Sequence, residues 1–139
     1  MELAIRKSGG HIIFHGVAMK PGMPTLFAVK EKTLIMGLSG NPFAAAVPFE
    51  LFLRPILSRM TSNPMLEPKG AVAQTENDFP KCSTTRRFIR AYCQNGIVDM
   101  PREQSNGQMR SMIGCNCLID VPAGTGTLHR GDSVNIIWL

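Results

Sequence analysis

The residues best suited to chemistry here are a lysine in a rigid loop and a glycine-rich turn before a predicted helix. Lys20 opens the motif KPGMP, in which two prolines fix the backbone and remove two hydrogen-bond donors. The second motif, GLSGNP at Gly37–Pro42, follows an apolar run that is typical of a buried strand. Asn41 can cap the first free N–H groups of a helix, and Pro42 suits the first helical position.

Both motifs could bind an anion. A strand, a glycine-rich loop and a helix N-terminus gather free backbone N–H groups at the positive end of the helix dipole. The lysine, held in a rigid loop directly after a predicted strand, adds a full positive charge. The same turn often does no more than pack a helix against a sheet, so the local pattern leaves both interpretations open.

The positive charges are scattered over the chain, except for a local cluster at Arg86, Arg87 and Arg90. The net charge is +5 and the isoelectric point is near 9.3. Such a cluster is either a solvated face or a contact for a phosphate, an oxyanion or a nucleic acid. Because the chain has one Trp, one Tyr and no interleaving of aromatic and basic residues, we expect no nucleic-acid partner.

The sequence contains no pattern that identifies a catalytic residue or a metal site. It has no paired-carboxylate motif, nucleophile elbow or Ser-His-Asp spacing, so the catalytic residues stay unknown. His11 and His15 would share a strand face but lie about 13 Å apart, which is too far for one metal. The four cysteines form no C-x-x-C pair, and we expect reduced thiols. They are Cys82, Cys93, Cys115 and Cys117.

The composition is that of a globular protein. Of 139 residues, 44% are hydrophobic and 18% are charged, which allows one domain or two small ones. The apolar runs are too short to cross a membrane and no segment reads as a signal peptide, so we expect a cytoplasmic protein without a membrane partner. The first residues resemble the last turns of a helix, which suggests that further residues precede them.

The first part of the chain predicts alternating helices and strands. A helix over residues 2–8 should end at Gly9-Gly10, because glycine readily adopts the left-handed C-cap conformation. Predicted strands cover 11–17, 25–30 and 33–37, the last two as a hairpin. A helix from Pro42 should end near 59–61, and Pro48 should kink it near 44–45 because proline cannot donate to the carbonyl four residues earlier.

The second part predicts an all-β module. Residues 61–70 are rich in Pro, Ser, Asn and Gly, which marks a domain boundary, and we predict domains at 1–62 and 68–139. Asn95-Gly96 is a strong signal for a tight hairpin. The predicted strands are 71–75, 87–94, 97–100, 118–122 and 133–139.

These motifs together resemble the C-terminal part of the molybdopterin molybdenumtransferase family, which includes MoeA and the gephyrin E domain. The resemblance rests on GVAMKPGMP (16–24), MGLSGNPFAAAVPFELFLRPIL (36–57), RRFIR (86–90) and CLIDVPAGTGTLHRGDSVNIIW (117–138), in the family's order. It implies the second half of a three-layer α/β domain of the molybdopterin-binding type, followed by a small C-terminal β-barrel domain.

The resemblance also implies an activity and a site. The family inserts molybdate into adenylylated molybdopterin, requires magnesium and acts as a homodimer. Lys20 matches the first lysine of the family's KPGKP motif. Arg90 matches a basic residue in the first strand of the family's β domain. Asn106, which lies beside Ser105, matches a serine of the family. The family's GLPGNP turn corresponds to Gly37, Ser39, Gly40, Asn41 and Pro42. In the family, these positions line the site for molybdate and the pterin phosphate between the two domains.

The sequence departs from the family pattern in ways that affect this site. Met23 replaces the second lysine of KPGKP and so removes a cation, and Ser39 replaces a proline. The family's glycine-rich GGVSVGD-type segment and first two domains are absent, so magnesium ligands are expected outside these residues and the 139 residues alone should not turn over. The alternative hypothesis is a non-catalytic binding or scaffold module of the gephyrin type, or a divergent paralogue. Convergence of Lys20 and Arg90 on one polar cleft would favour the enzyme.

Overall fold

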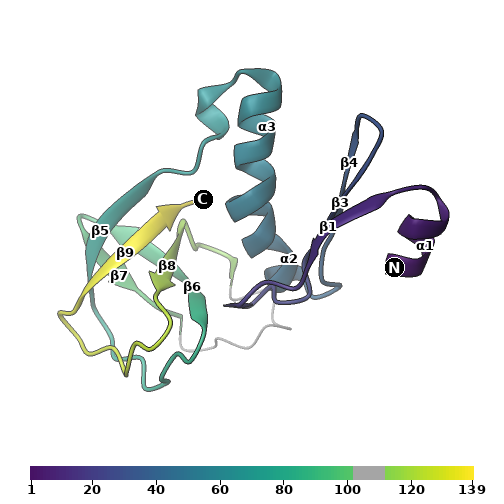
Figure 1. Cartoon of the computed structure of the whole chain (residues 1–139). Helices are drawn as coiled ribbons and strands as arrows, with labels where there is room; N and C mark the ends of the chain where they lie inside the picture. The colour runs from purple at the N-terminus through teal and green to yellow at the C-terminus, as the bar shows by residue number, and fades with distance from the viewer. Residues whose placement is uncertain (102–111) are drawn as a thin grey trace.

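A computed structural model of the chain describes residues 1–101 and 112–139. A helix and a three-stranded sheet form the N-terminal part, a long helical segment follows, and a β-barrel forms the C-terminal part (Figure 1). The predicted fold class, an α/β part followed by a small β-barrel, is confirmed. In the N-terminal part the elements are α1 (Glu2–Lys7), β1 (His11–His15), β2 (Met19–Lys20), β3 (Leu26–Lys30) and β4 (Thr33–Gly37).

The N-terminal sheet is antiparallel, in the order β1-β3-β4. β3 and β4 form the predicted hairpin, paired from Leu26 with Gly37 to Lys30 with Thr33. α1 ends as predicted, since Gly9 adopts a positive φ of 84°. Its buried residue, Ile5, joins Leu26 and Ala28 in a small core cluster. This sheet positions the turn that follows β4.

The long helix has an irregular centre. It consists of α2 (Pro42–Pro48), the π-helix η1 (Phe49–Leu53) and α3 (Arg54–Thr61). The predicted end near 59–61 is confirmed, but α2 is regular at 44–45, and the irregularity follows Pro48 instead. The Arg54 N–H bonds the carbonyl of Phe49, five residues earlier. The irregular turn lies between two prolines that lack N–H donors, so it accommodates both by widening.

The C-terminal part is a closed barrel. Its neighbours follow the order β6-β7-β5-β9-β8, and β8 pairs again with β6. After the short 3₁₀ helix η2 (Pro64–Leu66), the elements are β5 (Gly70–Thr75), β6 (Arg86–Gln94), β7 (Ile97–Asp99), β8 (Cys117–Val121) and β9 (Ser133–Trp138). The predicted strands agree with these bounds to within one or two residues. Asn95 and Gly96 both have positive φ, 53° and 77°, as the predicted tight hairpin requires.

β6 is buried on both faces, which connects the two parts of the molecule. Ile89 and its neighbours Ala91 and Cys93 point into the barrel core, whereas Phe88 packs outward against α2. Phe43 and Val47 of α2 lie in that outer cluster, together with Leu118 of β8 and Met19 of β2. The first part of the chain therefore packs directly on the barrel wall.

β2 extends the barrel sheet with a strand from the N-terminal part. It pairs with β6 in parallel, Met19 opposite Arg86 and Lys20 opposite Arg87. All four cysteines are free thiols, and Cys93 and Cys117 are buried. Over residues 1–101 and 112–139, no group of three His, Cys, Asp or Glu side chains could hold a metal ion. Within the same ranges, none of the helices is long and apolar enough to span a bilayer.

Candidate functional site

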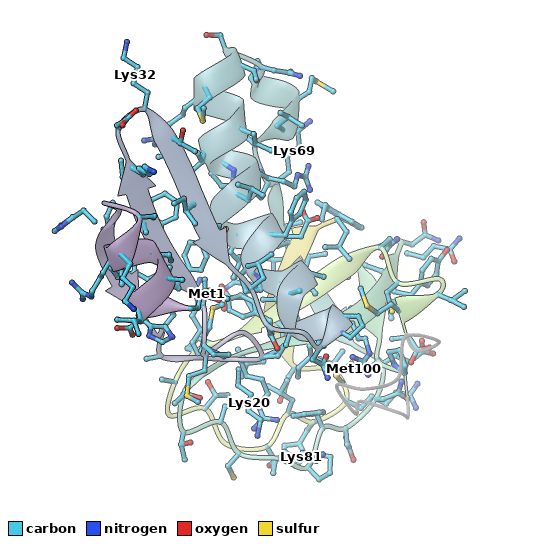
Figure 2. All side chains as sticks on the ribbon, turned by 90° about the vertical axis from the view of Figure 1, so that its right-hand side faces the viewer. Met1, Lys20, Lys32, Lys69, Lys81 and Met100 are labelled. Atoms are coloured by element: carbon cyan, nitrogen blue, oxygen red, sulfur yellow. The ribbon has the colours of Figure 1, made fainter. Side chains whose placement is uncertain are left out.

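A groove of about 440 Å³ lies between the KPGMP loop and the start of α2. Its lining is Ala18, Met19, Lys20, Pro21, Gly22, Met23, Pro24, Ser39, Asn41, Ala44 and Thr85. Among these described lining residues Lys20 is the single ionisable side chain, so the groove holds one positive charge and no carboxylate. Figure 2 shows Lys20 at the same end of the molecule as Lys81, which adds a second cation to this end. An anion in the groove would therefore meet one positive charge and, among the described lining residues, no carboxylate.

The KPGMP loop is held tightly, which fixes the origin of the Lys20 side chain. Gly22 has a φ of 101°, and a Cβ at this position would lie 2.6 Å from Met19 Cε and 2.7 Å from Pro48 Cγ. No other residue fits without displacing the loop or α2. Thr25 closes the loop, because its hydroxyl and its N–H both donate to the Gly22 carbonyl, at 2.6 and 3.1 Å. Lys20 itself is exposed at the end of β2.

The start of α2 forms the opposite wall of the groove. Asn41 caps the helix as predicted, since its Oδ1 accepts from the Ala44 N–H at 3.3 Å. The Ser39 hydroxyl accepts from the Asn41 N–H at 3.2 Å. Side chains of the turn thus bind two of the backbone donors that an anion could have used. The helix cap accounts for the residues of this turn without any bound ligand. The argument for an anion site therefore rests on the positive charge of Lys20.

Two arginines at the start of β6 lie beside the groove but do not line it. Arg86 forms a two-pronged ion pair with Asp120, its Nε and Nη2 lying 2.8 and 2.6 Å from the carboxylate oxygens. This hydrogen bond raises the pKa of Arg86, against a smaller lowering by burial. Arg87 lies over the Phe79 ring at 5.5 Å, and its Nη2 is 3.4 Å from the Cys82 carbonyl. Both side chains are directed to protein groups.

Arg90 lies on the same face of β6 as Phe88, against α2. Its side chain is 1% exposed, and its guanidinium carbon is 4.4 Å from the centroid of the Phe43 ring. It lines a separate, mostly apolar cavity of about 90 Å³ that also contacts Cys115 and Glu50. Burial lowers the pKa of Arg90, and the Cys115 thiol partly opposes this effect. Burial in turn raises the pKa of Cys115, with Arg90 acting against it.

The structure therefore brings together only part of the predicted site. Lys20, Ser39 and Asn41 line the groove, and Gly37, Gly40 and Pro42 shape its turn without lining it. The structure does not bring Arg90 to this groove. Lys20 lies opposite Arg87, and Arg90 is three residues further along β6, so its side chain lies on the opposite face of the sheet from Lys20 and lines a separate cavity. Ser105 and Asn106 lie outside the described residues.

One groove residue had no signal in the sequence. Thr85 immediately precedes β6 and contributes a hydroxyl to the lining. It reaches the groove because β2 pairs with the first residues of β6, across more than sixty residues of chain. No local pattern predicts a pairing between a two-residue strand and a distant one.

Comparison with known proteins gives matches over both halves of the chain. The model of the MoeA C-terminal region (domain IV) matches residues 72–139, and that of a probable molybdopterin-binding domain matches residues 1–59. A molybdopterin molybdenumtransferase of Bacillus subtilis (strain 168) is 34% identical over an alignment of 137 positions, which covers 96% of this chain. The chain belongs to the molybdopterin molybdenumtransferase family and corresponds to the C-terminal part of its members. A molybdopterin molybdenumtransferase of Staphylococcus aureus (strain Mu50) is 32% identical over 91% of the chain.

Solved structures support the same assignment. A MoeA protein of Pyrococcus horikoshii OT3, described as a molybdopterin biosynthesis protein, superposes with a TM-score of 0.74 at 29% identity, over 92% of this chain. A molybdenum cofactor biosynthesis protein of Pyrococcus furiosus superposes at 0.76 with 24% identity, which supports the fold alone. This member of the molybdenumtransferase family spans about a third of its curated relatives, 32% and 31% of their lengths.

The described residues do not fit a magnesium ion. Mg²⁺ binds through oxygen ligands, usually one or two carboxylates together with substrate phosphates. The groove contains no carboxylate among its described lining residues. Asp120, the acidic residue paired at the start of β6, is engaged by Arg86.

Proposed function

We propose that this chain is part of a protein of molybdenum cofactor biosynthesis that inserts molybdate into adenylylated molybdopterin. In this proposal the groove beside Lys20 binds the oxyanion, either molybdate or the phosphate of the pterin. The observation that carries the proposal is the position of Lys20. Among the described residues that line the groove it is the single charged group and none is a carboxylate, and Gly22 and Thr25 hold its loop in place. Family membership supports the choice of anion.

The groove has suitable donors for a tetrahedral oxyanion. A lysine ammonium carries three donors and a full charge, and bonds between charged groups are the stronger class of hydrogen bond. Ser39 and Thr85 add hydroxyl groups, and the Asn41 amide adds two further N–H donors. What these residues do is bind and orient the anion; the chemical step requires the molybdopterin substrate.

Met23 sets the expected strength of binding. It lines the groove and is 65% exposed at the position where the family has a second lysine. A thioether offers no positive charge, so this groove should bind an oxyanion more weakly than one with two lysines. The proposal is therefore a weak oxyanion site whose affinity depends on Lys20.

The remaining parts of the proposal concern the whole protein. We propose domains at residues 1–62 and 68–139, a homodimeric assembly, a cytoplasmic location and magnesium ligands outside these residues. The names of the relatives support a transferase. The two curated relatives are named as transferases, which favours the transferase over a gephyrin-type scaffold.

Molybdate binding by the 139-residue chain tests the proposal, with isothermal titration calorimetry as the measurement. Lys20→Ala should weaken binding about 10- to 100-fold, because a hydrogen bond to a charged group is worth about 1.5–3 kcal/mol. Lys32→Ala is the matched control, since Lys32 is exposed in the turn between β3 and β4, far from Lys20 (Figure 2). Equal binding by both variants, or no binding by the parent chain, would refute the proposed site.

A further inference from the structure

A second pocket, of about 280 Å³, lies between the N-terminal sheet and the long helix (Figure 1). The sheet contributes Phe14 and Phe27, and the helix contributes Leu51, Phe52, Pro55, Ile56 and Arg59. We call it the aromatic pocket. It shares no lining residue with the groove beside Lys20, so its occupancy is independent of the function proposed for that groove.

Three stacked or tilted rings fix one end of the aromatic pocket. Phe14 stacks on Phe27 across the pairing of β1 with β3, with ring centroids 5.7 Å apart, and the Phe52 ring lies 6.1 Å from that of Phe14. Phe52 belongs to the widened turn η1, which also packs through Leu51 and Phe52 on the outer cluster of the barrel. Such turns occur frequently at functional sites. The pocket is therefore preformed by the packing of sheet, helix and barrel.

The apolar walls of the aromatic pocket remain accessible to water. Each of its six apolar lining residues is half-buried, although together they form one continuous surface. Leu51, Pro55 and Arg59 are spaced by four residues, so they lie along one side of the helix. Apolar surface gathered in a pocket and left in water gains free energy when another apolar group covers it.

Arg59 supplies the one charge among the described residues that line the aromatic pocket. Its side chain is exposed in the last turn of α3, and within residues 1–101 and 112–139 no carboxylate forms an ion pair with it. The other arginine of α3, Arg54, is by contrast paired with Glu50. Arg59 lies two helical turns, or about 10 Å, from Phe52. A ligand would therefore meet aromatic rings at one end and a positive charge at the other.

We propose that the aromatic pocket is a docking site for a peptide segment of another protein, which inserts an aromatic or branched apolar side chain and pairs a carboxylate with Arg59. The volume favours a peptide over a free cofactor, because small-molecule pockets usually measure about 300–1,000 Å³ and this one is smaller. Aromatic residues and arginine are enriched in protein interfaces and their hot spots. An acidic partner also matches the net charge of +5.

The test is an NMR titration of the isotope-labelled 139-residue chain with the hexapeptide Gly-Phe-Leu-Ser-Asp-Gly. The peptide is acetylated and amidated, so that Asp carries its one charge. Its Phe and Asp are three residues apart, about 10 Å in an extended segment, which matches the distance from Phe52 to Arg59. The amides of residues 51–59 should shift on binding. Ile56→Ser should weaken binding about tenfold, because it removes apolar surface from the pocket.

Arg59→Gln tests the ion pair, and it should weaken binding about two- to fivefold, as expected for an exposed pair. Arg6→Gln is the matched control, because Arg6 is also exposed in the last turn of a helix. That helix, α1, packs through Ile5 and Leu26 on the opposite face of the sheet from Phe27. Arg6→Gln should leave the affinity unchanged. A second peptide with Asn in place of Asp should bind the parent chain and Arg59→Gln equally, because neither pair then contains both charges.

Several results would overturn the docking site. No shift of the amides at 51–59 at about 1 mM peptide would do so, and so would equal weakening by Arg6→Gln and Arg59→Gln, which indicates general charge attraction. A dimer of the parent chain that Ile56→Ser abolishes would show a second copy in the pocket instead. Loss of peptide binding in a longer form of the protein would show that another of its segments covers the pocket. If Ile56→Ser fails to fold, Arg59→Gln with the two peptides still decides, because Arg59 is exposed.

Discussion

Met23→Lys should strengthen oxyanion binding, because it adds a second cation to a groove that has one. Met23 lines the groove with Lys20 but is 65% exposed, so water screens much of the new charge. Exposed ion pairs contribute about 0.2–1 kcal/mol, whereas hydrogen bonds to charged groups contribute about 1.5–3 kcal/mol. The new lysine should therefore contribute about 1 kcal/mol to the binding free energy, between these two ranges, which corresponds to about a fivefold lower Kd for molybdate.

The assay is molybdate titration by calorimetry at two salt concentrations. Because the Debye length falls from about 10 Å at 0.1 M to about 3 Å at 1 M, the gain should shrink at high salt. Met65→Lys is the matched control: Met65 is 72% exposed in η2, beyond the far end of α3 (Figure 1). It adds the same charge without approaching the groove. Equal tightening by both variants, or none by Met23→Lys, would refute the reasoning.

Three other substitutions test the scaffold and its thiols. Ile119→Ala should lower the free energy of unfolding by about 2–5 kcal/mol, since Ile119 is 0% exposed in the barrel core; urea denaturation measures this, and a change below 1 kcal/mol would contradict the packing. Asn41→Ala should lower it by about 1 kcal/mol through loss of the cap, with Asn41→Ser as the control that keeps it. Burial raises the pKa of Cys117 to about 12 from 9.0, so stability from its protonated thiol is complete below pH 9 and decreases as the pH rises towards 12. A Cys117→Ala chain should lose less stability over this interval than the parent, and at pH 8 iodoacetamide should modify exposed Cys82 before Cys117.

Features with local causes were the ones that sequence reasoning predicted well. Alternating apolar residues and Asn95-Gly96 depend on neighbours along the chain, and the strands and hairpin appear where predicted. The Asn41 cap is equally local. The position of the irregularity in the long helix was wrong, because a widened turn after Pro48 satisfies the prolines better than a kink before it. Local rules thus predict where helices and strands form, but not how a helix accommodates prolines in its interior.

The groove and the position of Arg90 depend on contacts that are distant in sequence. In RRFIR, alternation alone places Phe88 and Arg90 on one face, but a charged residue is expected to face solvent. Its burial became possible because α2 brings Phe43 over the strand. The pairing of β2 with β6, which brings Thr85 to the groove, likewise has no local signal. Non-local pairing decided which predicted site residues meet.

The parallel pairing of β2 with β6 has a consequence for what happens when the backbone is cut between the two parts. The connection at residues 62–69 is the only covalent link between the two parts, yet Met19, Phe43 and Val47 from the first part share one cluster with Phe88 and Leu118 from the second. Cutting the backbone at this connection would leave that cluster and the added strand intact. The two pieces should remain associated as a nicked complex. The domain boundary predicted from the sequence therefore does not mark a place where the folded molecule separates.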